Sequence, residues 1–369
     1  MDFTFDEVQD DLRTLAARIV GDEVTTDRLR ELEAGTERID RKLWAELAKA
    51  NLLGIAVPER WGGMGYGIME LAILLTEVGR NVAPIPALAT LVLGALPIAR
   101  FGTDEQQGRL LPGVVDGTTF LTAALEEAGN PDLHHPGTIA RRGDDNWMLG
   151  GEKVAVPWGL LAGTILVSAT TDVGEPAVFL VRADASGLTR ERSDGTHREP
   201  QANLILDGVR VADADLLAQG ADVLDVIEQH ALAGLCATGV GVFERAIRIT
   251  AGYIAEREQF GKPLATFQGA TLKAADAYID TQAISVTTWS AIWRLAEGRP
   301  AADELAIAKF WVADGGQRVA HACQHLHGGM GVDIDYPIHR YFLWAKELEL
   351  RLGGATAQLL RIGESLAAV

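Results

Sequence analysis

The spacing of apolar residues divides the chain into a helical, a mixed and a second helical segment. In the first, apolar side chains recur every three or four residues, which predicts an amphipathic helix over residues 5–19. Similar spacing predicts helices over residues 41–53, 68–81, 86–98 and 103–115. Thr103 is a typical N-cap, and Gln106 completes a capping box. We therefore expect an N-terminal helical domain over residues 1–117.

From residue 118 to 218 the apolar runs are short and are separated by Gly, Asp, Asn and Pro. The clearest runs cover residues 120–125, 147–149, 164–169, 177–181 and 202–206. Their length and spacing predict a domain built on an antiparallel sheet or small barrel, and Asp207-Gly208 predicts a tight turn. The last domain, residues 219–369, is predicted to contain long helices over residues 223–257, 264–297 and 301–326. Long helices with short breaks indicate an antiparallel bundle, whose broad apolar faces can also pack across a subunit interface.

Composition limits the classes of partner. The chain has 369 residues, 48% of them hydrophobic, which is enough for two or three domains. A formal net charge of -18 argues against nucleic acid and anionic membranes as partners. We recognise no signal peptide and no apolar run long enough to span a bilayer. The two cysteines, Cys236 and Cys323, do not form a disulfide framework, so a cytoplasmic protein is expected.

The stretch from Arg257 to Gln268 lies between two of the long predicted helices. Gly261 and Pro263 interrupt the helical pattern, so the chain must turn here. A turn leaves the N–H groups at the start of the second helix open to an anion, and Arg257 adds donors suited to phosphate. Taken alone, the same residues could equally be a helix hairpin with an exposed, salt-bridging arginine.

Other clusters indicate less. There is no phosphate-binding Gly-x-x-x-x-Gly-Lys-Ser/Thr, no Gly-x-Gly-x-x-Gly unit between strand and helix, and no Gly-x-Ser-x-Gly. Three histidines and a cysteine alternate at the end of a predicted helix: His321, Cys323, His325 and His327. Positions two apart on a helix point roughly 200° apart, so no metal site is expected. Near the C-terminus, Thr356 and Gln358 could donate to a phosphate or ribose, although a plain helix start explains them as well.

Several motifs together resemble the acyl-CoA dehydrogenase family over essentially the whole chain. They are Val57-Pro-Glu-Arg-Trp-Gly-Gly-Met-Gly65, Arg257-Glu-Gln-Phe-Gly261 with Gln268, and His327-Gly-Gly-Met-Gly-Val332 running into Asp335-Tyr-Pro-Ile-His-Arg-Tyr341. The resemblance implies an α+β fold that ends in a four-helix bundle. It also implies FAD-dependent oxidation of an acyl-CoA thioester to the enoyl-CoA, with an electron-transfer flavoprotein as acceptor. A carboxylate removes the α-proton while hydride passes to the flavin.

The resemblance also implies which residues hold FAD. In the family, the Arg-x-x-Phe-Gly and His/Gln-x-x-Gly-Gly segments of one subunit hold the pyrophosphate and adenosine of its neighbour's FAD. The matching residues here are Arg257, Phe260, Gln268, His325, Gly328 and Gly329. Thr356 and Gln358 match positions that contact FAD in their own subunit.

The chain departs from the family pattern where the chemistry would occur. The usual glutamate base lies in Tyr-Glu-Gly-Thr-x-Gln, which aligns with Gly353-Gly-Ala-Thr-Ala-Gln358 and puts Gly354 at the base position. A second base position, used by some members on the first bundle helix, falls on Ala231, and the following arginine becomes Leu232. The family's Thr-Glu-Pro-x-Ala-Gly-Ser-Asp becomes Leu125-Glu-Glu-Ala-Gly-Asn-Pro-Asp132, and its Trp-Ile-Thr becomes Ala155-Val-Pro157, where proline has no donor for a flavin carbonyl.

The contrast between the family segments that this chain keeps and those that it lacks predicts a non-catalytic subunit. Segments that serve a neighbour's FAD are kept, while segments that serve this subunit's own flavin ring and acyl-CoA are lost. We hypothesise a subunit of an α2β2 dehydrogenase that resembles actinobacterial enzymes for steroid side-chain CoA thioesters, with a paralogous partner supplying the base. One alternative is a self-sufficient enzyme whose base has moved to Glu126, Glu127 or His230, with Glu126 the best of the three. Another is a structural or CoA-binding protein without flavin.

Overall fold

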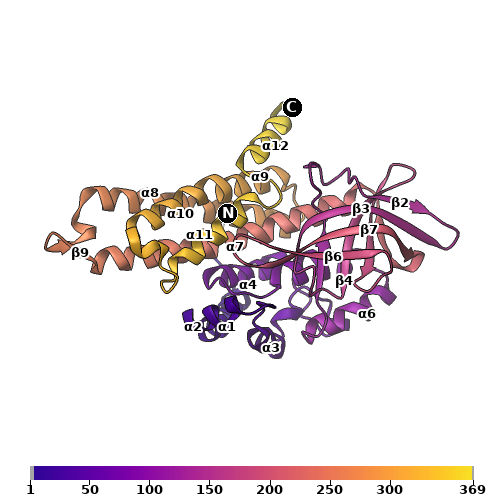
Figure 1. The fold of residues 1–369 in the computed structure, drawn as a ribbon, viewed down its shortest axis with the longest axis horizontal. Coiled ribbons are helices and arrows are strands. Elements are labelled where there is room, and N and C mark those ends of the chain that lie inside the picture. The colour runs from indigo at the N-terminus through magenta and orange to yellow at the C-terminus, as the bar shows by residue number, and fades with distance from the viewer. Residues whose placement is uncertain (1–3, 368–369) are drawn as a thin grey trace. The chain divides into compact units, whose positions relative to one another are not determined.

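The structure, a computed structural model, describes residues 4–367 (Figure 1). The chain forms two compact units, which are described in turn. One unit comprises the residues up to Glu31, Ala72–Ala83 and the chain from Leu232 onward; the other comprises Leu32–Leu71 and Pro84–Ala231. Helices come first along the chain, strands follow, and helices end it. The predicted α+β class is therefore confirmed.

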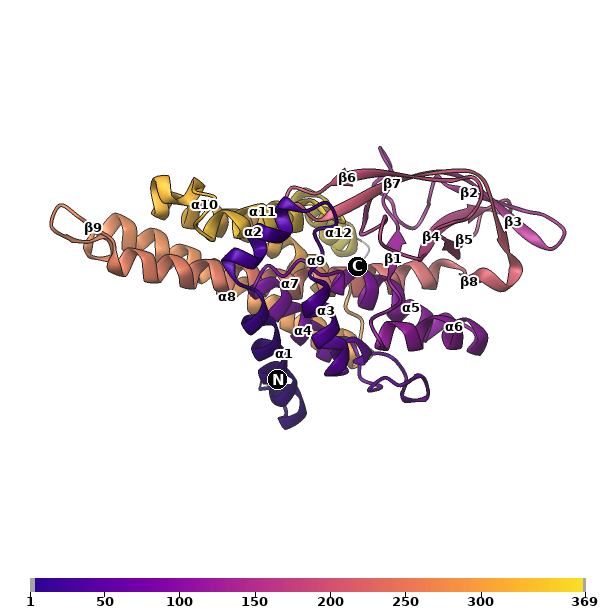
Figure 2. The same cartoon turned by 60° about the horizontal axis from the view of Figure 1, so that its bottom comes forward.

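The second unit is built on an eight-stranded sheet with the order β6-β7-β3-β2-β4-β5-β8, and β1 also pairs with β4. Its strands are β1 (Leu121–Ala124), β2 (Ile139–Arg142), β3 (Asn146–Pro157), β4 (Thr164–Thr171), β5 (Pro176–Arg182), β6 (Leu188–Asp194), β7 (Pro200–Ala212) and β8 (Leu216–Gln219). Figure 2 shows the β2–β3 hairpin extending beyond the rest of the sheet. Alternate side chains of the long strands face one apolar core that contains Trp147, Leu149, Phe179 and Leu204.

The sheet differs from the expectation in two ways. It is mixed rather than antiparallel, because β4 pairs in parallel with both β1 and β2. The predicted turn at Asp207-Gly208 is wrong, since both residues lie inside β7. Gly208 has a φ of +65° and lies opposite a register shift in β3 between Leu149 and Gly150, so the dipeptide marks a β-bulge.

Short helices complete this unit. They are α3 (Arg41–Lys49), η1 (Leu52–Gly54), η2 (Glu59–Trp61), the π-helical η3 (Leu88–Ala95), α5 (Leu96–Phe101) and α6 (Asp104–Val115). The predicted capping box of α6 is confirmed: Gln106 N donates to Thr103 Oγ1 at 3.2 Å and Thr103 N donates to Gln106 Oε1 at 3.0 Å. β1 lies directly on η3, where a Cβ at Gly94 would come within 2.3 Å of Leu121 Cβ.

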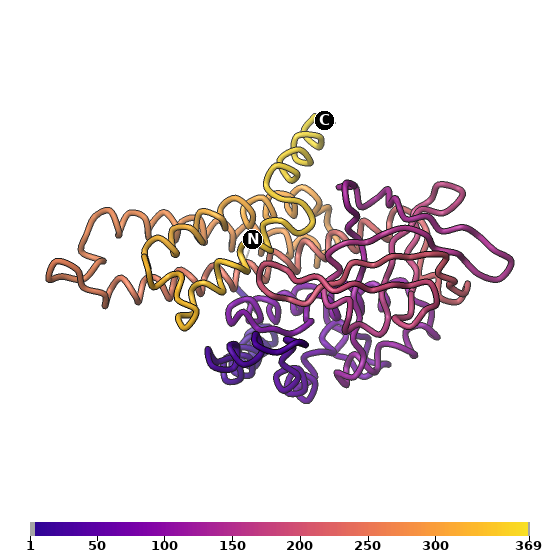
Figure 3. Tube along the Cα trace, in the orientation of Figure 1, coloured from indigo at the N-terminus to yellow at the C-terminus, as the bar shows by residue number. Residues whose placement is uncertain are grey.

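The first unit is helical. Its elements are α1 (Glu7–Glu23), most of α4 (Ile68–Arg80), most of α7 (Ala221–Glu256), α8 (Gln268–Ala296), α9 (Ala302–Phe310), the π-helical η6 (Trp311–Gly315), α10 (Gly316–His327), η7 (Gly328–Val332), α11 (Ile338–Leu350) and α12 (Ala355–Ala367). A further helix, α2 (Thr26–Ala34), lies across the boundary between the units. Figure 3 shows α7 and α8 running side by side and joined by the strands β9 (Glu258–Gln259) and β10 (Lys262–Pro263).

Glycines let α4 and α7 cross with their backbones in contact. A Cβ at Gly79 would lie 2.0 Å from Thr238 O, and one at Gly241 would lie 1.9 Å from Thr76 O. No larger residue fits at either position without moving a helix. Arg80 then bridges the helices, since it pairs with Glu77 at 3.1 Å and with Glu244 at 2.7 Å.

α7 is long and apolar enough, by length and composition alone, to cross a membrane. The sequence expectation concerned uninterrupted apolar runs, and charged residues such as Glu228 and Glu244 interrupt this helix. Its most apolar stretch is 89% buried inside the structure, which is typical of the central helix of a helical core.

Candidate functional site

The predicted turn between α7 and α8 is a small β-hairpin. Gln259 pairs with Lys262, and the two residues between them, Phe260 and Gly261, have φ angles of +52° and +75°. Two successive positive φ values are the geometry of a tight hairpin turn, which is unfavourable for a phenylalanine. Phe260 is also 94% exposed. The chain thus holds a strained, unburied aromatic ring at the tip of this hairpin.

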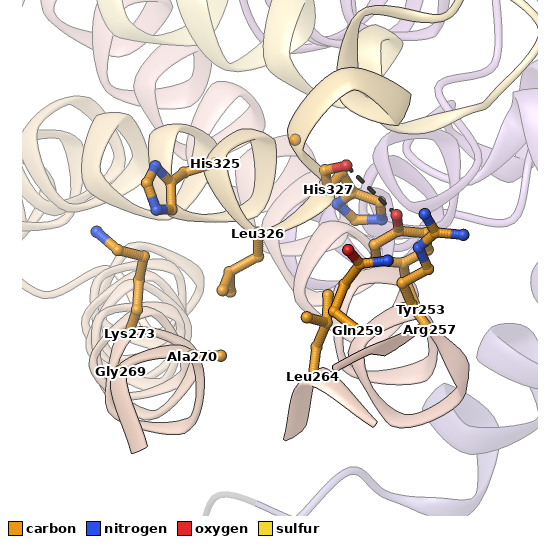
Figure 4. A pocket seen from close by; sticks show the side chains of 11 residues that line it. Tyr253, Arg257, Gln259, Leu264, Gly269, Ala270, Lys273, His325, Leu326 and His327 are labelled. Carbon is orange, nitrogen blue, oxygen red and sulfur yellow. Dashed lines mark hydrogen bonds between the residues drawn. The ribbon is translucent and has the colours of Figure 1, made fainter. Parts of the chain in front are cut away.

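A pocket of about 370 Å³ lies where the C-terminal end of α7, the start of α8 and the end of α10 converge (Figure 4). Tyr253, Arg257 and Gln259 line it from α7 and β9. Leu264, Gly269, Ala270 and Lys273 line it from the segment that leads into α8 and from α8 itself. His325, Leu326, His327 and Gly328 line it from the end of α10 and the start of η7. All three walls belong to the helical unit.

Three basic side chains of the pocket have no partner within the part of the chain that the structure describes. Within residues 4–367, the side chains of Arg257, Lys273 and His325 make no ion pair or hydrogen bond. The chain has 51 acidic residues against 33 Lys and Arg, yet no carboxylate of the described residues pairs with these three side chains. Basic groups gathered without internal partners are suited to an anionic ligand.

His327, in the same pocket, has a ring nitrogen that can accept a hydrogen bond but has no donor. Its Nδ1 lies 2.8 Å from Cys323 O, a contact that requires the proton on Nδ1 and leaves Nε2 as the acceptor. The ring stacks on Tyr253 with 4.4 Å between centroids. The residue is only 3% exposed, and Nε2 is buried without a donor in the described structure. Burial lowers the pKa of His327 and keeps the imidazole neutral, against the opposing effect of the Cys323 carbonyl.

The structure brings some of the predicted FAD residues together and leaves others apart. Arg257, His325 and Gly328 line the pocket, whereas Phe260, Gln268 and Gly329 are exposed close by along the chain. Thr356 and Gln358 lie in α12. Sequence reasoning missed Tyr253, Lys273 and His327. Tyr253 and Lys273 lie one turn from Arg257 and Gly269, so helical spacing around the quoted motif is the pattern that could have found them.

Gln358 is wholly buried and bonded within its own chain. Its Nε2 donates to Leu352 O at 3.2 Å and to Gly353 O at 3.3 Å. Buried Lys309 donates from Nζ to Glu349 O at 3.1 Å and to Gly353 O at 2.9 Å. Two side chains therefore hold the backbone that leads to the position of the family's catalytic glutamate.

Gly354, at that position, is not required by the backbone. Gly353 has a φ of +89°, which favours glycine, but Gly354 has no such strained angle. A Cβ added at Gly354 would meet only Glu349 O, at 3.5 Å, which is ordinary contact. The missing carboxylate is therefore a chemical change that the local fold does not demand.

We expect Gly354→Glu to leave the free energy of unfolding within about 0.5 kcal/mol of the original, because a Cβ fits there and the backbone angle is ordinary. Gly353→Ala is the matched control, and should cost about 1–2 kcal/mol because an alanine must then adopt a positive φ. Thermal denaturation of both variants measures the difference. Strong destabilisation by Gly354→Glu would show that glycine is needed there for folding.

Glu127, one of the alternative bases, is held in place by an ion pair and several hydrogen bonds within this chain. Its carboxylate lies 2.7 Å from the Nζ of Lys153, which is 0% exposed, and it accepts further hydrogen bonds from Asn130, Gly137 and Thr138. Burial alone would raise the pKa of Glu127, but Lys153 and Thr138 outweigh it and lower the pKa to about 2. Such a carboxylate is a poor proton acceptor near neutral pH.

The segment that corresponds to the family's flavin-ring contact offers few backbone donors. Val154 N donates to Glu126 O at 2.9 Å, and Ala155 N donates to Asn203 Oδ1 at 3.1 Å. Pro157 has no N–H, and Trp158 N donates to Pro200 O at 2.8 Å. Trp158 itself is 3% exposed and packs with Ile39 and Ala89 in a core cluster of this unit.

Comparison with known proteins identifies the family. Residues 6–118 match the N-terminal domain of acyl-CoA dehydrogenase and residues 220–367 match its C-terminal domain. The chain is 40% identical to "Acyl-CoA dehydrogenase FadE27" of Mycobacterium tuberculosis, over 100% of this chain and 99% of that one. Its fold matches the structure titled "Tcur3481-Tcur3483 steroid ACAD" with a TM-score of 0.92 and 47% identity, over 98% of each chain.

A second solved relative is the ChsE4-ChsE5 complex from Mycobacterium tuberculosis. The match has a TM-score of 0.94 and 40% identity, and covers 100% of each chain. With both terminal domains and the full length matched, the fold expected from the resemblance is confirmed. The chain belongs to the acyl-CoA dehydrogenase family of FAD-dependent oxidoreductases that act on CH–CH bonds.

Proposed function

We propose that this chain is the non-catalytic subunit of a heteromeric acyl-CoA dehydrogenase. It would hold the pyrophosphate and adenosine of FAD and build the assembly, while a paralogous subunit supplies the base and most contacts to the flavin ring. The observation that carries the proposal is Gly354, a glycine at the base position whose backbone would accept a side chain. Neither Gly354 nor Ala231 can take a proton from an acyl-CoA thioester.

This chain also offers few donors for the flavin ring, in addition to lacking the base. In segment 154–158, the amides of Val154, Ala155 and Trp158 are bonded within this chain, and Pro157 has none. Donors to the flavin carbonyls stabilise negative charge on the flavin as it accepts hydride, so a segment in which three amides are already bonded and Pro157 has none supports the same division of labour. The unpaired basic groups around Arg257 support the part that is kept.

The two solved relatives support a steroid-type CoA thioester and a paralogous partner in an α2β2 assembly. One is titled a steroid ACAD and names two components, and the other is a complex of two named chains. An exposed stripe on α8 supplies a suitable surface: Leu272, Ile279 and Val286 recur every seven residues and are each more than half exposed. Apolar residues at that interval suit packing against another helix. An electron-transfer flavoprotein remains the proposed acceptor.

A self-sufficient enzyme is the second possibility. Of its three proposed bases, Glu127 is disfavoured by its low pKa. His230 donates from Nδ1 to Val226 O at 2.7 Å, and burial lowers its pKa, so a neutral imidazole remains. Glu126 and His230 therefore stay as the alternatives, and no specific contact favours either.

Co-expression with paralogous dehydrogenase chains tests the proposal. We expect this chain alone to show little flavin absorbance and no turnover of acyl-CoA, and a co-purified complex to be yellow and active. Mutation of the partner's base should then abolish turnover while FAD is retained. If this chain alone forms a yellow oligomer that oxidises acyl-CoA, the proposal is wrong and the relocated base becomes the explanation. A complex without flavin would instead favour a structural role.

A further inference from the structure

The pocket near Arg257 has two polar ends rather than one. Figure 4 shows Arg257, Gln259 and Tyr253 on one side, and Lys273 and His325 facing each other on the opposite side. Apolar side chains lie between the two groups, among them Leu264 and Leu326. Arg257 follows the last residue of α7, whereas Lys273 lies in α8. The family motifs account for Arg257 and His325 but not for Lys273.

The second end combines two features that favour an anion. Phe267, the N-cap of α8, makes no side-chain cap, so the first amides of this 29-residue helix are not satisfied by a capping side chain. Gly269 and Lys273 are four residues apart on α8 and both line the pocket. A phosphate at this end would meet the partial positive charge of the helix start and the Lys273 ammonium.

An independent observation is a buried acceptor in the pocket wall that a ligand with a hydrogen-bond donor would satisfy. The Nε2 of His327 is a buried acceptor without a partner in the part of the chain that the structure describes. The ring cannot turn to satisfy it without losing the 2.8 Å contact of Nδ1 with Cys323 O and the stacking on Tyr253. Leaving a buried polar atom unpaired costs about 1–3 kcal/mol, which a bound hydroxyl or amine would recover.

We infer that Lys273 is a second phosphate-binding residue of this pocket and that His327 accepts a hydrogen bond from the nucleoside part of the same ligand. The pocket then takes a nucleoside diphosphate, with Arg257 and Lys273 sharing the negative charge of the two phosphates. The inference rests on the proposed FAD role and deepens it. It assigns cofactor positioning to Lys273, which lies outside the quoted motifs, and to His327, which begins one of them but was given no role in FAD binding.

Binding of ADP, which is the corresponding half of FAD, tests the inference by calorimetry on the purified chain and on its complex with the catalytic partner. We expect Lys273→Met to weaken ADP binding about tenfold or more and to reduce its dependence on salt, because one charge-assisted hydrogen bond is lost. Lys262→Met is the matched control. Lys262 is exposed, lies 4.7 Å from the centre of the Phe267 ring and does not line the pocket. It should change affinity less than about twofold.

His327→Phe and His327→Gln separate hydrogen bonding from packing. Phenylalanine keeps the stacking on Tyr253 but has no acceptor, whereas glutamine restores one. We expect ADP to bind about tenfold more weakly to His327→Phe and to recover in His327→Gln. Folding of each variant is verified by its thermal midpoint.

The outcomes distinguish the inference from the proposed function. If Lys273→Met binds ADP as the original chain does while Arg257→Ala does not, the second phosphate contact is wrong and the proposed FAD role stands. If neither change affects ADP binding or FAD retention in the complex, the proposed FAD role of this pocket fails as well. Equal weakening by His327→Phe and His327→Gln would overturn the acceptor role.

Discussion

Replacing Lys153 with methionine is expected to lower the free energy of unfolding of the sheet unit by about 3–5 kcal/mol, because it leaves the Glu127 carboxylate without its buried partner. Lys153 Nζ lies 2.7 Å from Glu127 Oε1 and 2.9 Å from Ser168 Oγ. Glu127 in turn accepts hydrogen bonds from the amides of Gly137 and Thr138. The carboxylate thus closes the whole loop from residue 127 to 138. Urea denaturation, together with proteolysis of that loop, measures the effect.

The control for this prediction is an exposed ion pair of the same unit. Arg182 and Asp184 lie 2.6 Å apart, and each side chain is at least 70% exposed. Arg182→Ala should leave the urea midpoint nearly unchanged, since water screens the pair. The double change Lys153→Met with Glu127→Gln should recover part of the loss by removing the unpaired charge. A loss of less than about 1 kcal/mol for Lys153→Met alone would show that water reaches the carboxylate and that the pair does not hold the loop.

Arg257→Ala should weaken FAD binding to the assembled enzyme about 10- to 100-fold, because a charge-assisted hydrogen bond to phosphate contributes about 1.5–3 kcal/mol. The guanidinium is exposed and has no internal partner in the described chain, so folding should not change. Flavin absorbance after gel filtration measures retention, and titration of the flavin-free complex measures affinity.

Arg248→Ala is the matched control for Arg257→Ala. Arg248 is exposed on the same helix but does not line the pocket. It should leave FAD binding unchanged. Unchanged FAD retention after Arg257→Ala would return the hairpin to a structural role and would remove the main support for a shared cofactor site.

The sequence predicted elements well where burial imposes a period on the chain. The capping box at Thr103 and Gln106 and the long helices of the bundle follow from local spacing, and the structure confirms them. β6 was missed because it is an edge strand with the polar sequence LTRERSD, and an edge strand needs no alternating pattern. The dipeptide Asp207-Gly208 was misread because a bulge and a hairpin turn both require a residue at positive φ.

The candidate site shows the same limit. The sequence located Arg257 and His325 through motifs, but the position of Lys273 opposite His325 at one end of the pocket depends on how α8 and α10 pack. The sequence offered Glu127 as a candidate base and did not reveal its ion pair, because its partner Lys153 lies 26 positions further along the chain. Long-range pairs of this kind leave no local pattern.

By itself, the sequence determined which chemical groups this protein possesses: a glycine at the base position, the FAD-binding motifs of its family and a large excess of negative charge. These properties depend only on which residue stands at each position, so they hold however the chain folds. Only the tertiary structure decided the backbone angle, the tautomer and the hydrogen-bond partners of particular residues. It showed that Gly354 has a backbone open to a side chain, that His327 has a fixed tautomer with a bare acceptor, and that the basic groups beside Arg257 are unpaired. Burial, hydrogen-bond partners and φ angles depend on which distant segments meet, and that is settled only when the helices and strands pack.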